Sequence, residues 1–115
     1  MLSRFLLSLL LLGAAAPAAQ AKQCGEASFY GYEHHGMQTA SGSRFDAYAP
    51  TAAHPSLPFG TRLLVTNRDN GKQTIVMIND RGPYYGGRII DLSRGSFSKI
   101  ASPSQGIARV CIARL

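Results

Sequence analysis

The chain has 115 residues with 12 basic and 6 acidic side chains, which gives a formal net charge of +6 at pH 7. This length supports one small domain and excludes a multidomain architecture. The basic charge leaves three alternatives open: a nucleic acid, an anionic cell-wall polymer or lipid, or a solvated basic surface that only maintains solubility.

Residues 1–21 have the pattern of a secretory signal peptide. A positive charge at Arg4 precedes the apolar residues 5–12, and Ala19-Gln20-Ala21 matches an A-x-A cleavage site. The apolar run is too short to span a bilayer as an ordinary helix. We therefore expect export to the periplasm or the extracellular space, where a nucleic acid is not an expected partner.

The mature domain is then expected to comprise residues 22–115. The residues before Cys24 are not the small apolar residues of a lipidation site, so no membrane anchor is expected. Cys24 and Cys111 lie near the two ends of this domain, and an even pair in an oxidising compartment predicts a disulfide. A catalytic cysteine is the alternative, but no neighbouring group is of the kind that lowers a thiol pKa.

A long segment over residues 31–59 is predicted to be irregular, because it is rich in glycine and proline. Loops of this length in a small domain are often functional. Asp46 and His54 are its candidate site residues, since an imidazole can bind a substrate or tune a carboxylate; the alternative for His54 is an ordinary loop histidine. Because His34 and His35 are adjacent and no metal-ligand spacing is present, neither a metal site nor a cofactor is predicted.

The regular elements are predicted to be mostly strands. Residues 62–67 and 73–78 form a hairpin in the prediction, because Asn70-Gly71 between them favours a tight turn. Shorter strands are expected at 27–30, 88–90 and 107–112. One short helix is expected over 94–101, with Ser93 as its N-cap and Pro103 after its end. This pattern predicts a small, mainly β protein with a closed or nearly closed barrel.

Asp80 and Asp91 flank the glycine- and tyrosine-rich loop over residues 83–87, and each follows an apolar, β-branched run. Cleavage of a glycosidic bond uses one carboxyl group as an acid and commonly a second beside it. The acid must stay partly protonated, which burial or a neighbouring carboxylate can achieve. The structural alternatives are an Asx turn for Asp80, and helix capping or pairing with Arg88 for Asp91.

Aromatic side chains on loops can receive the apolar faces of sugar rings. Tyr84 and Tyr85 lie between the two aspartates and are the strongest candidates for substrate contact, with Tyr30 as a further one. Phe29 and Phe45 are expected to be buried in the core instead.

Seven motifs, in order along the chain, resemble those of the RlpA (rare lipoprotein A) family: Gly25–Gly31, Thr39–Gly42 with Phe45-Asp46, Thr51–His54, Leu57–Thr61, Val65–Asn67, Asn79–Pro83 and Arg88–Ser93. The resemblance implies a six-stranded double-psi β-barrel with one short helix. It also implies endolytic cleavage of peptidoglycan glycan strands that lack stem peptides, which leaves 1,6-anhydro ends. Such an enzyme is expected to act as a monomer.

By this resemblance Asp46, His54, Asp80 and Asp91 are the expected catalytic residues. Asp91 would be the acid and base, and Asp80 the carboxylate beside it. The residues expected to bind the glycan are Tyr30, Thr39, Arg81, Tyr84 and Tyr85.

One departure from the family pattern bears on activity. Ser43 stands three positions before Asp46, where the family usually has Glu. This departure keeps open a non-catalytic, expansin-like wall-binding module. A small secreted toxin or inhibitor on the same barrel is a third alternative.

Overall fold

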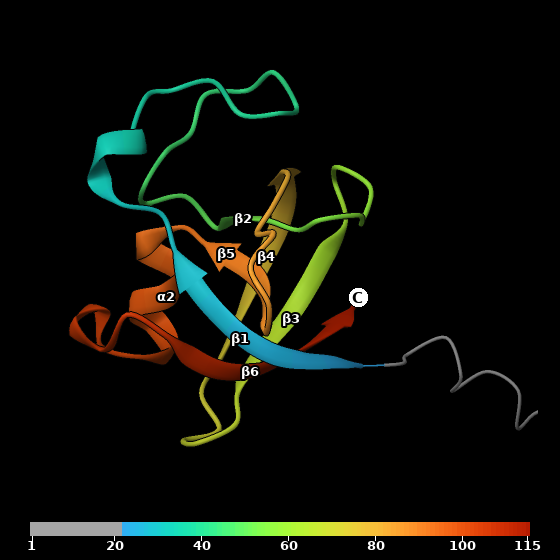
Figure 1. The fold of residues 1–115 in the computed structure, drawn as a ribbon, viewed down its shortest axis with the longest axis vertical. Helices are drawn as coiled ribbons and strands as arrows, with labels where there is room; N and C mark the ends of the chain where they lie inside the picture. The colour runs from blue at the N-terminus through green and yellow to red at the C-terminus, as the bar shows by residue number, and fades with distance from the viewer. Residues whose placement is uncertain (1–21) are drawn as a thin grey trace, which may run out of the picture.

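The computed structural model describes residues 22–115, so the predicted signal peptide lies outside the described residues. Six strands in this part close into a barrel with the order β1-β5-β2-β4-β3-β6 (Figure 1). The strands are β1 (Gln23–Phe29), β2 (Thr51–Ala53), β3 (Arg62–Asn67), β4 (Gln73–Asp80), β5 (Arg88–Leu92) and β6 (Ala108–Arg114). Residues 22–115 also contain one α-helix, α2 (Arg94–Ile100), and two short 3₁₀ turns, η2 (Tyr32–His34) and η3 (Pro103–Gln105). The predicted mainly β, six-stranded barrel of the double-psi type is therefore confirmed.

The hairpin β3–β4 forms as predicted. Its strands pair antiparallel, with Leu63 opposite Val76. The turn is fixed by its own polar residues: Asn70 Oδ1 accepts a hydrogen bond from the Lys72 N–H at 2.9 Å, and Gly71 takes a φ of +77°. A glycine adopts this left-handed conformation without the steric cost that a side chain would add.

Strands β1 and β6 close the barrel on the side of the two termini. They pair antiparallel, and Cys24 lies directly opposite Cys111. The two cysteines form the predicted disulfide, with a sequence separation of 87 residues. The covalent link therefore crosses the seam between the first and last strands.

The prediction of an irregular segment over residues 31–59 was wrong at one place, because Thr51–Ala53 forms β2. This strand lies between β5 and β4 in the barrel. This strand pairs parallel with β4 and antiparallel with β5. Its alanines carry little strand preference of their own, so its conformation comes from the two longer strands on either side.

Helix α2 begins after Ser93, whose hydroxyl oxygen accepts a hydrogen bond from the Ser96 N–H at 3.2 Å. The prediction of this N-cap is confirmed. The helix buries Phe97 and Ile100 against the barrel. Phe97 contacts the ring of Phe29, with ring centroids 4.6 Å apart.

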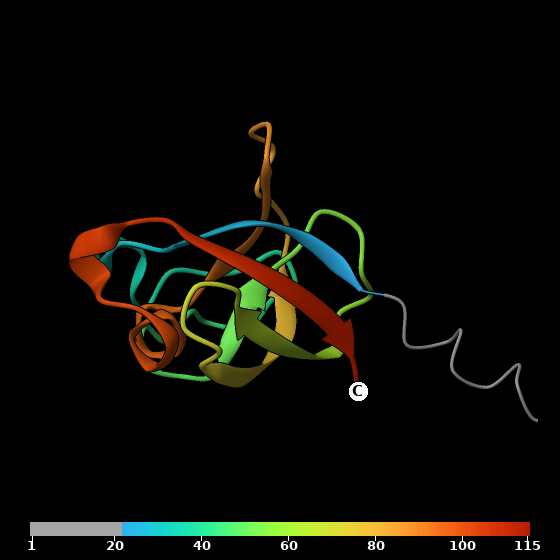
Figure 2. The same cartoon turned by 90° about the horizontal axis from the view of Figure 1, so that it is seen from below.

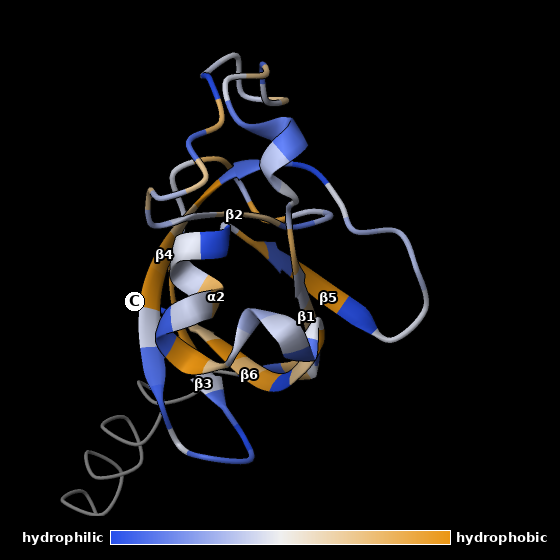
Figure 3. Ribbon diagram, turned by 90° about the vertical axis from the view of Figure 1, so that its left-hand side faces the viewer, coloured by the Kyte–Doolittle hydropathy of each residue, from blue (hydrophilic) through white to orange (hydrophobic). Residues whose placement is uncertain are grey.

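Alternate residues of the strands fill the barrel interior, and the strands carry most of the hydrophobic colour in Figure 3. The side chains of this core come from all six strands and α2: Ala27, Ala52, Leu63, Val65, Val76, Ile78, Ile90, Leu92, Phe97, Ile100, Ala108, Val110 and Ile112. Phe45 is buried as predicted, while Phe29 is only partly buried and packs against the core. No helix within residues 22–115 has the length and apolar character needed to cross a membrane.

Candidate functional site

The two candidate aspartates come from the strands on either side of β2. Asp80, the last residue of β4, lies opposite Ala53, and Asp91 of β5 lies opposite the same alanine. Ser28 of β1 is in turn opposite Asp91. Because directly opposed residues of neighbouring strands project to the same side, Ser28, Asp91 and Asp80 share one face of the sheet. We call these three residues, with Ala53, the carboxylate row.

A register shift in the β2–β4 pair makes this alignment possible. Ala52 pairs with Ile78, but Ala53 pairs with Asp80, so Asn79 is the extra residue of a bulge. Ile78 points into the core, and without the bulge Asp80 would have the same orientation. The bulge therefore turns the Asp80 carboxylate to the side on which Asp91 lies, as bulges next to functional sites commonly do.

The Asp80 carboxyl group is held by three donors. The Tyr30 hydroxyl donates to Oδ2 at 2.5 Å, and the backbone N–H groups of Ala40 and Arg81 donate to Oδ1 at 2.8 and 2.9 Å. An ionised carboxylate has acceptor sites only, so it matches three donors. Asp80 thereby joins β4 to the end of β1 and to the loop around Ala40.

Tyr30 lies under the influence of both aspartates. Burial raises the pKa of its hydroxyl well above the ordinary value, the hydrogen bond to Asp80 raises it further, and the negative charges of Asp80 and Asp91 contribute as well. Tyr30 therefore stays a protonated donor at neutral pH. Its ring is stacked on Phe45 at 4.5 Å, which fixes the direction of the hydroxyl.

The surroundings of Asp91 are different. Its Oδ1 accepts a hydrogen bond from the Ser28 hydroxyl, and no other donor to this carboxyl group is found in residues 22–115. Neither structural alternative for Asp91 holds: Ser93 caps α2, and the described residues contain no ion pair between Asp91 and Arg88. Asp91 is half-buried, and its second oxygen has no bonded partner in the described part of the chain.

Asp46 and His54 make their side-chain hydrogen bonds elsewhere. Asp46 is exposed, and its Oδ1 accepts from the Tyr48 N–H at 2.8 Å within a turn. The His54 ring is buried and bonds to Gln23 through Nε2 at 3.0 Å, while Nδ1 accepts from the backbone of the following loop. Burial, and then the positive charge of Arg81, lower the pKa of His54. The structure thus does not bring these two side chains into hydrogen bonds with the carboxylate row.

Two of the predicted glycan-binding residues shape loops around the row. The Arg81 guanidinium donates to the carbonyl oxygen of Leu57 at 2.8 Å and lies 4.1 Å above the centre of the Phe59 ring. The Thr39 hydroxyl donates to the Ser43 carbonyl at 2.9 Å and lies 3.0 Å from the Ser43 hydroxyl. Ser43 is therefore hydrogen-bonded to Thr39, and the next residue, Ala40, donates its N–H to Asp80.

Tyr84 and Tyr85 lie on the loop between β4 and β5, which projects from the barrel in Figure 2. Their side chains are 76% and 72% exposed, so both rings are accessible to a ligand. Arg88 lies 5.3 Å from the centre of the Tyr85 ring. Of the five residues expected to bind glycan, Tyr84 and Tyr85 have the most exposed side chains.

Sequence reasoning missed Ser28, because nothing in its local sequence distinguishes it from any small strand residue. Its importance comes from the pairing of β1 with β5, which places its hydroxyl on Asp91. Ser28 is buried, as is Ala27 beside it, so only the pairing of the strands shows that its hydroxyl lies on the side of Asp91.

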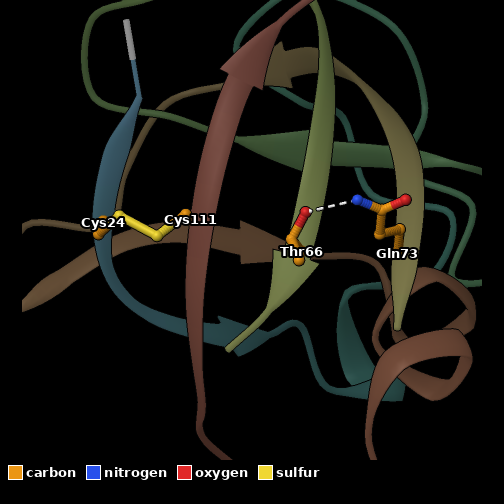
Figure 4. The surroundings of a disulfide bond; sticks show 4 residues. All are labelled: Cys24, Thr66, Gln73 and Cys111. Carbon is orange, nitrogen blue, oxygen red and sulfur yellow. Dashed lines mark hydrogen bonds between the residues drawn. A yellow bond between two sulfur atoms is a disulfide. The ribbon is translucent and has the colours of Figure 1, made fainter. Parts of the chain in front are cut away.

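A hollow on the other side of the barrel lacks such carboxyl groups. Its volume is about 420 Å³, and its lining includes Thr66, Gln73 and Cys111. Figure 4 shows these residues near the Cys24–Cys111 disulfide. The lining of the hollow comes mainly from β3 and β6, across the barrel from β2 and β5, and contains no carboxyl group. In residues 22–115 no group of three or more His, Cys, Asp or Glu side chains is placed to hold a metal ion.

Comparison with known protein families gives a match over nearly all of the described chain. The family model described as lytic transglycolase matches residues 22–112. The chain is 53% identical over 88 residues to a protein of Synechocystis sp. named probable endolytic peptidoglycan transglycosylase RlpA. The aligned region covers 76% of this chain and 27% of that protein. It is 46% identical over 97 residues to the endolytic peptidoglycan transglycosylase RlpA of Neisseria meningitidis, covering 84% of this chain and 41% of the relative. The chain thus spans less than half the length of these relatives.

Solved structures with the same fold have more distant sequences. The Streptomyces papain inhibitor superposes with a TM-score of 0.67 at 23% identity, covering 83% of this chain and 94% of the inhibitor. An expansin from Clavibacter michiganensis gives a TM-score of 0.65 at 20% identity, over 83% of this chain and 50% of the expansin. At these identities the similarity establishes the barrel fold alone.

Proposed function

The chain belongs to the RlpA family of lytic transglycosylases, and we propose that it cleaves the glycan strands of peptidoglycan at internal positions. The observation that carries this proposal is the alignment of Asp80 and Asp91 on one face, opposite Ala53. Two carboxyl groups with unlike surroundings are what an acid-base reaction on a glycoside requires. We also propose that the substrate strands lack stem peptides and that the protein acts as a monomer, after removal of residues 1–21 on export to the periplasm or beyond.

In the proposed reaction Asp91 acts first as an acid and then as a base. Its carboxyl proton passes to the glycosidic oxygen as the bond from that oxygen to C1 of N-acetylmuramic acid breaks. The C6 hydroxyl of the same sugar then bonds to C1, and its proton returns to the Asp91 carboxylate. No water is consumed, and the product carries a 1,6-anhydro ring.

The surroundings of Asp91 suit this double role. Its single hydrogen bond, from Ser28, orients one oxygen, and the second oxygen accepts no bond from residues 22–115. Asp80, held in one orientation by three donors, would face the positive charge that develops on the sugar ring. Tyr84 and Tyr85 would contact sugar faces, and Asp46, His54, Thr39, Arg81 and Tyr30 would keep the surrounding loops in place.

The test is to incubate the protein with peptide-free glycan strands and to analyse the products by mass spectrometry. We expect fragments with anhydro ends, and a rate at least about 100-fold lower for Asp91→Asn, the scale of a lost general acid. Asp69→Asn is a matched control, because Asp69 is an exposed carboxylate paired with Arg109. Strand cleavage at an undiminished rate by Asp91→Asn would refute the proposal.

A second candidate function is a non-catalytic, wall-binding module of the expansin kind. Ser43, in place of the family's Glu, is the observation that favours it, because this position adjoins the segment that holds Asp80. If the protein sediments with glycan strands but yields no anhydro products, the binding function is supported. Cleavage that appears in Ser43→Glu would then identify the missing carboxyl group.

A further inference from the structure

A cluster of one arginine and three aromatic rings lies at the end of β1 and the start of α2. The Arg94 guanidinium lies 4.7 Å from the centre of the Tyr32 ring and 5.5 Å from that of Phe29. The Tyr48 ring is 6.0 Å from Tyr32, tilted by 47°. We call Phe29, Tyr32, Tyr48 and Arg94 the Arg94 cluster.

Two rings of the cluster are exposed, Phe29 and Arg94 are half-buried, and Arg94 forms no ion pair with a carboxylate in the described residues. Tyr32 is 51% exposed and Tyr48 is 67% exposed, which is unusual for two aromatic rings in contact. Within residues 22–115 Arg94 makes neither an ion pair nor a side-chain hydrogen bond. Its N–H donors therefore have no partner among the described side chains, while the adjoining rings hold the planar group in position.

The cluster adjoins the carboxylate row along two strands. Phe29 follows Ser28, whose hydroxyl bonds to Asp91, and is paired with Leu92 of β5. Arg94 is three residues beyond Asp91, so the two Cα atoms can be at most about 10 Å apart. This is on the order of the length of one disaccharide unit, so one strand could reach both.

We propose that the Arg94 cluster is a subsite for a sugar that carries a free carboxylate. A guanidinium binds a carboxylate through two parallel hydrogen bonds, and the adjoining tyrosine rings suit the apolar face of the sugar. In the glycan strands of the proposed function, on which this inference rests for its substrate, that sugar is N-acetylmuramic acid. Its lactyl carboxylate is free only when the stem peptide has been removed, because a peptide converts it into a neutral amide.

Arg94 would therefore be a specificity-determining residue. It binds a strand without peptides by pairing with the free lactyl carboxylate, whereas in a peptide-bearing strand this group is an amide and cannot form the pair. The alternative is that Arg94 only covers Phe29 and the core beneath it.

The test measures binding without turnover, in the Asp91→Asn protein. The probe is a fluorescent tetrasaccharide of alternating N-acetylglucosamine and N-acetylmuramic acid, either with free carboxylates or with each converted to a methylamide. By fluorescence polarisation we expect the carboxylate form to bind about three- to tenfold more tightly, as suits one partly exposed charge-assisted contact. Adding Arg94→Gln should remove this preference and leave binding of the methylamide unchanged.

Arg62→Gln is the matched control, because Arg62 is an exposed arginine at the start of β3, outside the carboxylate row, and its loss changes the net charge equally. It should keep the preference. Equal binding of the two probes by the parent protein, or a preference that survives Arg94→Gln, would overturn the inference.

If Arg94→Gln fails to fold, an NMR titration of the parent protein with both probes decides. The resonances that shift only with the carboxylate probe must include those of the Arg94 side chain, and their absence would overturn the proposal. Because no step requires cleavage, a binding preference with no strand scission would refute the lytic function alone.

Discussion

Asp80 and Asp91 differ in how many donors reach their carboxyl oxygens, and the proposed reaction gives them different roles on this ground. Asp80 accepts from Tyr30, Ala40 and Arg81, which ties three segments of chain together. Asp91 accepts only from Ser28 among the described residues. In the proposed reaction Asp91 releases and regains a proton, which needs freedom at one oxygen, and one oxygen of Asp91 accepts no bond from the described residues. The bonds to Asp80 hold the surrounding loops, and in the proposal its carboxyl group also faces the sugar.

In the proposed reaction Ser28 would be a positioning residue, and its removal should affect the rate more than binding. In Ser28→Ala we expect kcat on peptide-free glycan to fall roughly tenfold, because Asp91 loses the bond that orients it, while KM stays within a factor of two or so. Ser28→Thr keeps a hydroxyl and should restore most of kcat. Thermal denaturation checks that both variants fold. A purely structural serine would instead give equal rates per folded molecule in all three proteins.

At the scale of elements, β3 and β4 were predictable and β2 was not, while β1, predicted over 27–30, begins at Gln23. The β-branched runs of β3 and β4 and the Asn70-Gly71 turn contain their own local signals. In β2 the sequence Thr51-Ala52-Ala53 contains no such signal, and its pairing depends on strands distant in sequence. The bulge that re-aims Asp80 has the same origin, so the sequence could suggest two aspartates in one cleft but not the register that aligns them.

Helix α2 packs so close to the backbone of Tyr48 that only a glycine fits at position 95. A Cβ added at Gly95 would lie 2.9 Å from the Tyr48 carbonyl oxygen and 3.0 Å from its Cα. In Gly95→Ala the gain in helix propensity is at most about 1 kcal/mol, whereas the clash with backbone should cost more. We expect the free energy of unfolding in urea to fall by about 1–2 kcal/mol. Ser98→Ala, at an exposed position of the same helix, should change it by less than about 0.5 kcal/mol.

The loop after β2 should give the protein a pH-dependent stability through His54. The pKa of this ring is lowered below the ordinary value of 6.5 in the folded protein, so the unfolded chain binds the proton more readily. The contribution of His54 to stability is therefore complete above pH 6.5 and is lost as the pH falls below it. His54→Asn can still accept the loop N–H bonds but does not titrate, so its unfolding free energy, measured in urea between pH 7.5 and 5, should decline less steeply. Identical slopes for the two proteins would contradict this assignment.

Over the whole molecule, the candidate site is assembled from segments far apart in the chain. Ser28 and Asp91 are separated by 63 residues and Tyr30 and Asp80 by 50, yet each pair is hydrogen-bonded. The parallel pairing of β1 with β5 and of β2 with β4 produces these contacts. Local sequence patterns contain no information on such pairings. The sequence could therefore single out the two aspartates as candidates, but not their hydrogen bonds with Ser28 and Tyr30.

In the same topology the first strand, β1, pairs with the last, β6. A covalent link between these two strands closes a long loop of the chain and therefore constrains the unfolded state strongly. The Cys24–Cys111 disulfide closes a loop of 87 residues, for which the chain-entropy model gives about 4–5 kcal/mol. The backbone pairing of the two strands remains when the link is removed, so we expect the Cys24→Ser, Cys111→Ser double variant to keep the barrel but to unfold at a lower urea concentration. Reductant should shift the parent protein to the same midpoint and leave the variant unchanged. A fall of less than about 1 kcal/mol in the free energy of unfolding would contradict this expectation. The pairing of β1 with β6 would then be sufficient, and the disulfide would not act by constraining the unfolded chain.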